Sequence, residues 1–234
     1  KRIRIDGLYL DEAELGELCK ALKQVRSMVN FFQSAEENAY LLLKQRTADV
    51  PVYPVLIERI DSILDKFGHI KDNASPELAR IRREILSKQS SVSKRLVAIM
   101  KQAQSDGIVD SDASISMRDG RAVIPVPSGN KRRLNGIVLD ESSTGRTSYV
   151  EPAEVVVMNN EIRELQYEER REVIRILTDM SSTIRPYIQD IIFSLEYLGY
   201  IDFVRAKAIY AYETESALPL IENRQGMYWA SARH

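Results

Sequence analysis

The feature that most constrains the fold is a stretch with a period of two, residues 114–160, which lies between two long helical patterns. Within it, Asp119-Gly120 is the strongest two-residue hairpin signal, because both central positions of a type I′ turn need a positive φ. Such a turn fixes the register of the two strands, and the sequence therefore predicts a small antiparallel sheet carried by two helices. The predicted pairs are Arg118 with Arg121, Met117 with Ala122, Ser116 with Val123 and Ile115 with Ile124.

This register separates an apolar face of the hairpin from a polar one. On the polar face, Arg118 lies opposite Arg121, and two like charges in that position normally repel each other. The two arginines either stay in water or pair with a nearby carboxylate, or else they await an anion such as a phosphate. The apolar face is predicted to contain Ile115, Met117, Ala122, Ile124 and Val126, and the polar face Ser114, Ser116, Arg118 and Arg121.

The charge balance limits how this chain could bind nucleic acid. The 234 residues include 33 Lys and Arg against 34 Asp and Glu, for a net charge of −1. A protein that binds nucleic acid over most of its surface is basic, so any such contact is predicted to be confined to a patch. The cations at turns and loops of the predicted sheet are the candidates for nucleic-acid contact: Arg118, Arg121, Lys131, Arg132, Arg133 and Arg146.

The helix that leads into the sheet has the clearest start in the sequence. Ser75-Pro76-Glu77 supplies an N-cap, a residue with φ preset for the first helical turn and an acid for the helix dipole. The helical pattern then continues to about Gln104, and its charged outer face, which is expected to be solvent-exposed, is typical of a projecting arm. A second long pattern returns from Glu151-Pro152, and Pro186 either kinks or divides it.

Catalytic and metal-binding patterns are missing from the sequence. The piece Ser128-Gly129-Asn130-Lys131 lacks the first glycine of a phosphate loop and the helix that must follow it. A nucleophilic serine within residues 141–145 would need a base, and the two histidines, His69 and His234, are far away in sequence. No His and Cys cluster has metal-ligand spacing. We therefore expect this chain to have no catalytic residues, no metal ligands and no cofactor site of its own.

The single cysteine and the hydropathy pattern bear on the compartment. Cys19 cannot form an intramolecular disulfide, which suits a reducing cytoplasm, and its sequence context predicts a role in helix packing. No apolar run approaches the roughly 18 residues that span a bilayer. The sequence thus predicts a cytoplasmic protein without membrane contact.

Three groups of motifs occur in a fixed order along the chain. They are FGHIKDNASPEL (67–78) with Arg80-Ile81-Arg82, then RDGR (118–121) with VIPV (123–126), then GIVLD (136–140) leading to Glu151-Pro152 and Asn159-Asn160. Through these motifs the chain resembles the middle region of the MutS-two branch of bacterial MutS-like ATPases over nearly its whole length. One departure is Arg146, where many members have a small residue.

The resemblance implies a mainly α fold with a small inserted antiparallel β-sheet, made of a helical core bundle, long lever helices and a four-stranded clamp-like sheet. It also implies homodimers that bind branched or junction DNA in a mismatch-repair family, suppress homologous recombination, and in some members act on stalled ribosomes through rRNA. ATP, Mg²⁺ and the endonuclease activity belong to the full-length family, in domains absent from this chain. The implied segments are a helical core (1–74), an outgoing lever (75–106), the clamp-like sheet (107–151), return lever and core helices (152–217) and a connector to an ATPase domain (218–234).

Two functions of different classes remain open from the sequence. The first is a non-catalytic nucleic-acid clamp that couples to an ATPase outside the chain. The second is a helical dimerisation or protein-interaction module without direct contact to nucleic acid, which the near-neutral charge and the Glu-rich return helix favour.

Overall fold

The computed structural model describes residues 2–216 together with residues 218, 221, 223, 225, 226 and 228. The chain divides into two compact units, the first made of Lys1–Lys20 and Pro54–Ile188, the second of Ala21–Tyr53 and Gln189–His234. Helices dominate, and the strands form one antiparallel sheet, so the predicted fold class is confirmed.

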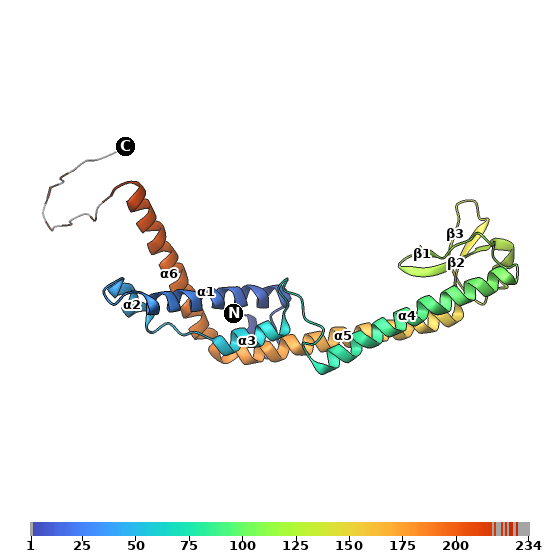
Figure 1. The fold of residues 1–234 in the computed structure, drawn as a ribbon, viewed down its shortest axis with the longest axis horizontal. Helices are drawn as coiled ribbons and strands as arrows, with labels where there is room; N and C mark the ends of the chain where they lie inside the picture. Colours follow the sequence, from blue (N-terminus) through green and yellow to red (C-terminus); the bar gives the residue numbers. More distant parts are fainter. Residues whose placement is uncertain are drawn as a thin grey trace. The chain divides into compact units, whose positions relative to one another are not determined.

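Helices make up the first part of the chain (Figure 1). Residues Arg2–Arg4 form a 3₁₀ turn, followed by α1 (Glu12–Ser34), α2 (Leu41–Thr47) and α3 (Pro54–Ile63). Helix α1 starts at a capping box, in which the amide of Glu14 donates to Asp11 Oδ1 at 2.8 Å and the amide of Asp11 donates to Glu14 Oε2 at 3.0 Å. In the sequence, the acidic pair Asp11-Glu12 predicts a helix start here, and α1 begins at Glu12.

Helix α3 ends earlier than its apolar pattern predicts. The apolar residues of its buried face continue in the sequence to Phe67 and predict a longer helix, but the helix stops at Ile63 and Phe67 is 74% exposed. The cause is Asp65, whose Oδ1 accepts hydrogen bonds from the amides of Phe67 and His69 and so turns the chain. Gly68 lies within this turn with a φ of 88°.

Two long antiparallel helices, α4 (Pro76–Ser105) and α5 (Ala153–Ile184), lie side by side and carry the sheet between them in the sequence (Figure 1). The predicted N-cap of α4 is present, since Ser75 Oγ accepts from the amide of Leu78 at 3.0 Å. At 30 residues, α4 is about 45 Å long. We call this helix pair the arm.

Apolar side chains run continuously along the arm and under the sheet. Because the sheet and both helices share one core, the sheet is fixed to the arm and is not a loosely tethered module. The buried members are Ile81, Ile85, Val92, Leu96, Met100, Ala103, Val109, Ile124, Val126, Leu134, Val150, Val155, Ile162 and Leu165.

The sheet has four strands in the order β1-β2-β4-β3, all antiparallel. The strands are β1 (Ser116–Arg118), β2 (Arg121–Pro127), β3 (Gly136–Glu141) and β4 (Thr147–Pro152), with a 3₁₀ turn at Ser128–Asn130. Strand β3 requires glycine at its first position, because a Cβ on Gly136 would overlap the carbonyl oxygen of Glu151.

The hairpin has the predicted turn and register. Asp119 and Gly120 have φ values of 48° and 74°, as a type I′ turn needs, and Arg118 pairs with Arg121. The predicted apolar face is wrong at Met117, which is 59% exposed, because β1 is a short edge strand whose end extends past the core.

The second unit contains α2, most of α1 and α6 (Ile188–Glu213). Val25, Val29 and Val50 form its core, with Leu195 and Tyr197 packed against them. A 3₁₀ turn at Arg185–Tyr187 separates α5 from α6, so Pro186 divides the return pattern instead of kinking one helix.

Two further predictions concern the C-terminal region. The apolar pattern of the sequence predicts a separate helix from Ile201 to Ala217, but α6 continues through Gly199 without a break and ends at Glu213. Much of the predicted connector, including Trp229, lies outside the described residues. Among the residues that are described, no helix is long and apolar enough to cross a membrane.

Candidate nucleic-acid interface

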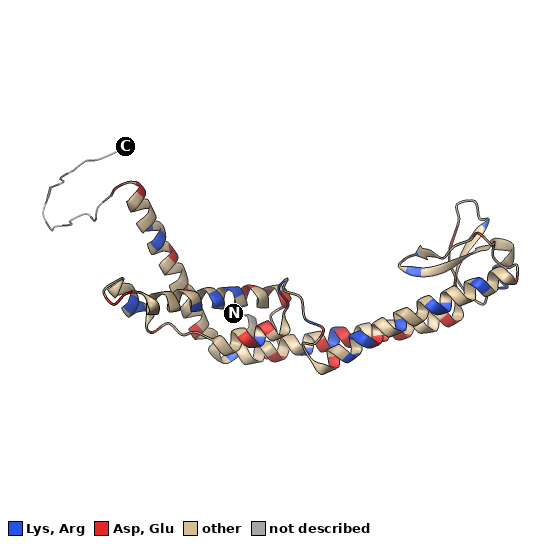
Figure 2. Ribbon diagram, viewed as in Figure 1, with Lys and Arg blue, Asp and Glu red and all other residues tan. Residues whose placement is uncertain are grey.

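The two helices of the arm carry opposite charge (Figure 2). Helix α4 contains seven Lys and Arg and two Asp and Glu, whereas α5 contains four Lys and Arg and seven Asp and Glu. The Glu-rich pattern of α5, with its interspersed arginines, predicts ion pairs within that helix. Several of these carboxylates bind the other helix instead.

Ion pairs between the helices repeat along the arm. Lys88 Nζ lies 2.6 Å from Glu161 and Arg95 lies 2.6 Å from Glu154, so a step of seven residues along α4 is a step of seven back along α5. Hydrogen bonding to Glu161 raises the pKa of Lys88 above its ordinary value. Nearer the start of α4, Arg82 contacts Glu169 at 2.7 Å. These pairs fix the relative register of the two helices.

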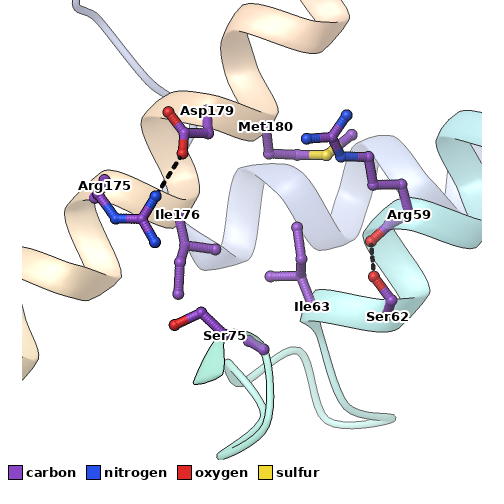
Figure 3. A pocket seen from close by; sticks show the side chains of 9 residues that line it. Arg59, Ser62, Ile63, Ser75, Arg175, Ile176, Asp179 and Met180 are labelled. Carbon is purple, nitrogen blue, oxygen red and sulfur yellow. Dashed lines mark hydrogen bonds and ion pairs between the residues drawn. The ribbon is translucent and has the colours of Figure 1, made fainter. Parts of the chain in front are cut away.

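A buried carboxylate links the start of α4 to α5. Ser75 Oγ donates to Glu172 at 2.5 Å, and Arg175 donates two hydrogen bonds of 2.7 Å to the same carboxylate. The hydrogen bonds from Arg175, with a smaller contribution from Ser75, hold the pKa of Glu172 below its usual value although burial opposes them. Ser75 and Arg175 also line a small pocket with Arg59 and Asp179 (Figure 3). Because Arg175 is already paired with both Glu172 and Asp179, this pocket is not a strong anion site.

At the sheet, the two hairpin arginines have carboxylate partners. Arg118 Nε donates to Asp140 at 2.9 Å, and its guanidinium carbon lies 3.7 Å from the centroid of the Tyr149 ring. Arg121 Nη1 donates to Glu151 at 2.7 Å. Glu151 is completely buried and also accepts from Asn159 at 2.7 Å. The sequence left several interpretations of Arg118 and Arg121 open. In the structure, both pair with nearby carboxylates.

Two of the four remaining candidates also have partners. Lys131 forms an exposed ion pair of 2.9 Å with Glu141, and this hydrogen bond lowers the pKa of Glu141. Arg133 donates to the carbonyl oxygen of Asp106 at 3.2 Å.

Arg132 and Arg146 differ from these four. Both side chains are exposed, and neither forms a hydrogen bond or ion pair with any residue that the structure describes. Arg132 follows the 3₁₀ turn after β2, and Arg146 ends the turn between β3 and β4, so both belong to loops of the sheet. Their positive charge is therefore available to an outside anion.

Two lysines on the arm and two residues of the sheet were not predicted from the sequence. Lys94 and Lys101 on α4 are exposed, without ion pairs among the described residues, and their spacing of seven places them on one side of the helix. That spacing was visible in the sequence. Tyr149 and Asp140 were not identifiable as partners of Arg118, because the three residues lie on different strands.

No protein-family model matches the chain. Curated relatives do match over its whole length. Endonuclease MutS2 of Lactiplantibacillus plantarum is 34% identical over 238 residues, covering 100% of this chain and 30% of the relative. Endonuclease MutS2 of Pelotomaculum thermopropionicum is 35% identical over 97% of this chain and 29% of the relative, and that of Enterococcus faecalis is 32% identical over 100% and 30%.

A helical arm that carries a small sheet, with this similarity from end to end, defines the chain as a piece of a MutS-like protein. The chain spans about 30% of the length of the relatives that it matches. It belongs to the MutS2 family.

Proposed function

We propose that this chain is the non-catalytic arm and clamp of a MutS-like ATPase that binds branched or mismatched DNA as a dimer and suppresses homologous recombination. The observation that carries the proposal is the pair of exposed arginines in the loops of the sheet, Arg132 and Arg146, which have no partner among the described residues. Phosphate contact by such cations supplies affinity without reading sequence, which suits a target defined by its shape.

The arm supports this proposal by its construction. The sheet shares a core with both helices, and ion pairs fix the helices against each other, so a load on the sheet is transmitted along the arm. In this proposal ATP and Mg²⁺ bind outside the chain, as does the nuclease activity that the relatives' name states. Stalled ribosomes are a further target, since rRNA offers the same phosphate chemistry.

The test uses the full-length protein and a four-way DNA junction. The double variant Arg132→Glu with Arg146→Glu should weaken binding by on the order of 10-fold and reduce the slope of log K against log salt by about 2. The matched control is Arg163→Glu with Arg171→Glu, which makes the same change of charge at exposed positions on α5. Equal loss of affinity in both double variants would contradict a specific role for the sheet loops.

A second candidate function is a helical interaction module without contact to nucleic acid. The observation that favours it is the exposed apolar surface of α6, where Phe203 is 60% exposed, Tyr210 67% and Tyr212 86%. Sedimentation analysis of Phe203→Ser with Tyr210→Ser separates the two functions. Loss of the dimer would support this candidate if the arginine variants described above bind the junction normally.

A further inference from the structure

Three interactions hold the Arg118 side chain at the polar face of the sheet. Its Nε donates to Asp140 on β3, its Nη1 donates to the carbonyl oxygen of Met117 at 2.8 Å, and its guanidinium lies over the ring of Tyr149 of β4. These contacts join β1 to β3 and β4, and Val123 on the intervening strand β2 is completely buried. Three contacts thus fix the position of the guanidinium.

This arrangement is poorly suited to a phosphate. Asp140 is 48% exposed beside Arg118, and a phosphate that approaches the arginine also approaches this carboxylate. The other arginine of the face, Arg121, is neutralised by the buried Glu151. The net charge of the four side chains is zero, so the polar face offers little attraction to an anion.

The same arrangement is well suited to a flat, uncharged π system. Arg118 is 34% exposed, so part of its side chain remains open to solvent while the guanidinium lies over Tyr149. A guanidinium plane and an aromatic ring are the two kinds of surface on which unpaired bases stack. The stack is already ordered before a ligand binds, so binding loses little side-chain entropy.

We propose that the Arg118–Tyr149 stack binds a single unpaired nucleobase, which stacks on the outer side of the Arg118 guanidinium. The inference rests on the proposed function and names the feature of the target that the sheet recognises, an unpaired base at a branch, bulge or loop. Arg146 lies three residues before Tyr149, about 10 Å along an extended strand, and its free charge binds the backbone next to that base.

The experiment uses the full-length protein and two oligonucleotides of equal length, each with one fluorescent 2-aminopurine. In one the analogue is unpaired in a bulge, and in the other it is paired within a duplex. The wild type should bind the bulged DNA on the order of 10-fold more tightly and change its fluorescence on binding. Tyr149→Leu and Arg118→Lys should abolish both the preference and the fluorescence change, since each removes one layer of the stack.

Two controls separate this inference from the proposed function and from misfolding. Tyr149→Phe keeps the ring and should keep the preference, while circular dichroism checks that Tyr149→Leu is folded. Arg132→Gln with Arg146→Gln should weaken binding to both DNAs equally. If the wild type binds both DNAs tightly without preference, the base site is wrong and the clamp stands. If it binds neither DNA, the proposed function itself is wrong.

A parallel pair of RNA oligonucleotides identifies the source of the base. A preference for the bulge in both DNA and RNA, lost in Tyr149→Leu, shows that the base itself is the ligand. A preference confined to one of them assigns the site to that nucleic acid. An unchanged preference in Tyr149→Leu and in Arg118→Lys, in both nucleic acids, overturns the proposal.

Discussion

The hairpin and the loops of the sheet contain arginines that are indistinguishable in the sequence but differ in the structure. Arg118 and Arg121 in the hairpin are bound to Asp140 and Glu151, whereas Arg132 and Arg146 in the loops have no partner among the residues that the structure describes. A count of cations therefore overstates the positive charge that a ligand meets. Strand pairing decides which arginines remain available, because it brings carboxylates from distant strands to the hairpin.

The sharpest test of this comparison replaces one arginine from each region. Arg121→Gln should destabilise the protein by about 3 kcal/mol, because it leaves the buried carboxylate of Glu151 without its counter-charge. Arg132→Gln should change the free energy of unfolding by less than about 0.5 kcal/mol. Urea denaturation measures the free energy of unfolding of both variants, and hydrogen exchange in β2 and β4 measures the local effect. Equal stability of the two variants would contradict the difference between the hairpin and loop arginines.

A substitution in β3 tests whether the carboxylate partners of the hairpin arginines depend on the position of that strand. Gly136→Ala should cost about 2 kcal/mol, since the added methyl group meets the carbonyl of Glu151 and pushes β3 away from β4. Gly129→Ala is the matched control, because nothing lies within 4 Å of its Cβ position and its φ is not in the left-handed region. Thermal unfolding should show a lower Tm for Gly136→Ala alone.

The pH dependence of stability tests a paired charge at the start of the arm. The pKa of Glu172 is depressed below its ordinary value of 4.5, chiefly by Arg175. A carboxyl group of this kind adds stability above that ordinary pKa, and the stability is lost as the pH falls through the lower pKa of the folded state. The free energy of unfolding should therefore fall below about pH 4.5, and more steeply than in Glu172→Gln. Parallel curves for the two proteins would show that this carboxylate is not responsible.

The smallest effect is expected at the exposed pair of Lys131 and Glu141. Lys131→Gln should leave the Tm unchanged, because an exposed ion pair contributes little. An NMR titration should nevertheless show the pKa of Glu141 rising toward its ordinary value once the lysine is removed. A clear loss of Tm would mean that this pair resembles the hairpin pairs more than its exposure indicates.

Local signals predicted much of this fold. The Asp119-Gly120 turn, the register that follows from it and the Ser75 N-cap all depend on a few neighbouring residues, and all are present. The end of α3 was missed because the side chain of Asp65 captures backbone amides that the apolar pattern assigned to the helix.

The candidate site was less accessible from the sequence. Whether Arg118 is paired depends on Asp140, which lies on a strand separated from β1 by two others in the sheet. The same holds for α5, whose glutamates looked like partners of their own helix until α4 was placed beside them. Long-range charge pairing of this kind has no signature in a local pattern.

The seven-residue repeat of the ion pairs has a consequence for the length of the arm. Removing seven residues from α4 and the matching seven from α5 would keep the register of the two helices, since the pairs of Lys88 with Glu161 and Arg95 with Glu154 are seven residues apart on both helices. Each such deletion would shorten the arm by about 10 Å without altering its ends. The distance between the sheet and the start of the arm can therefore change in steps of seven residues.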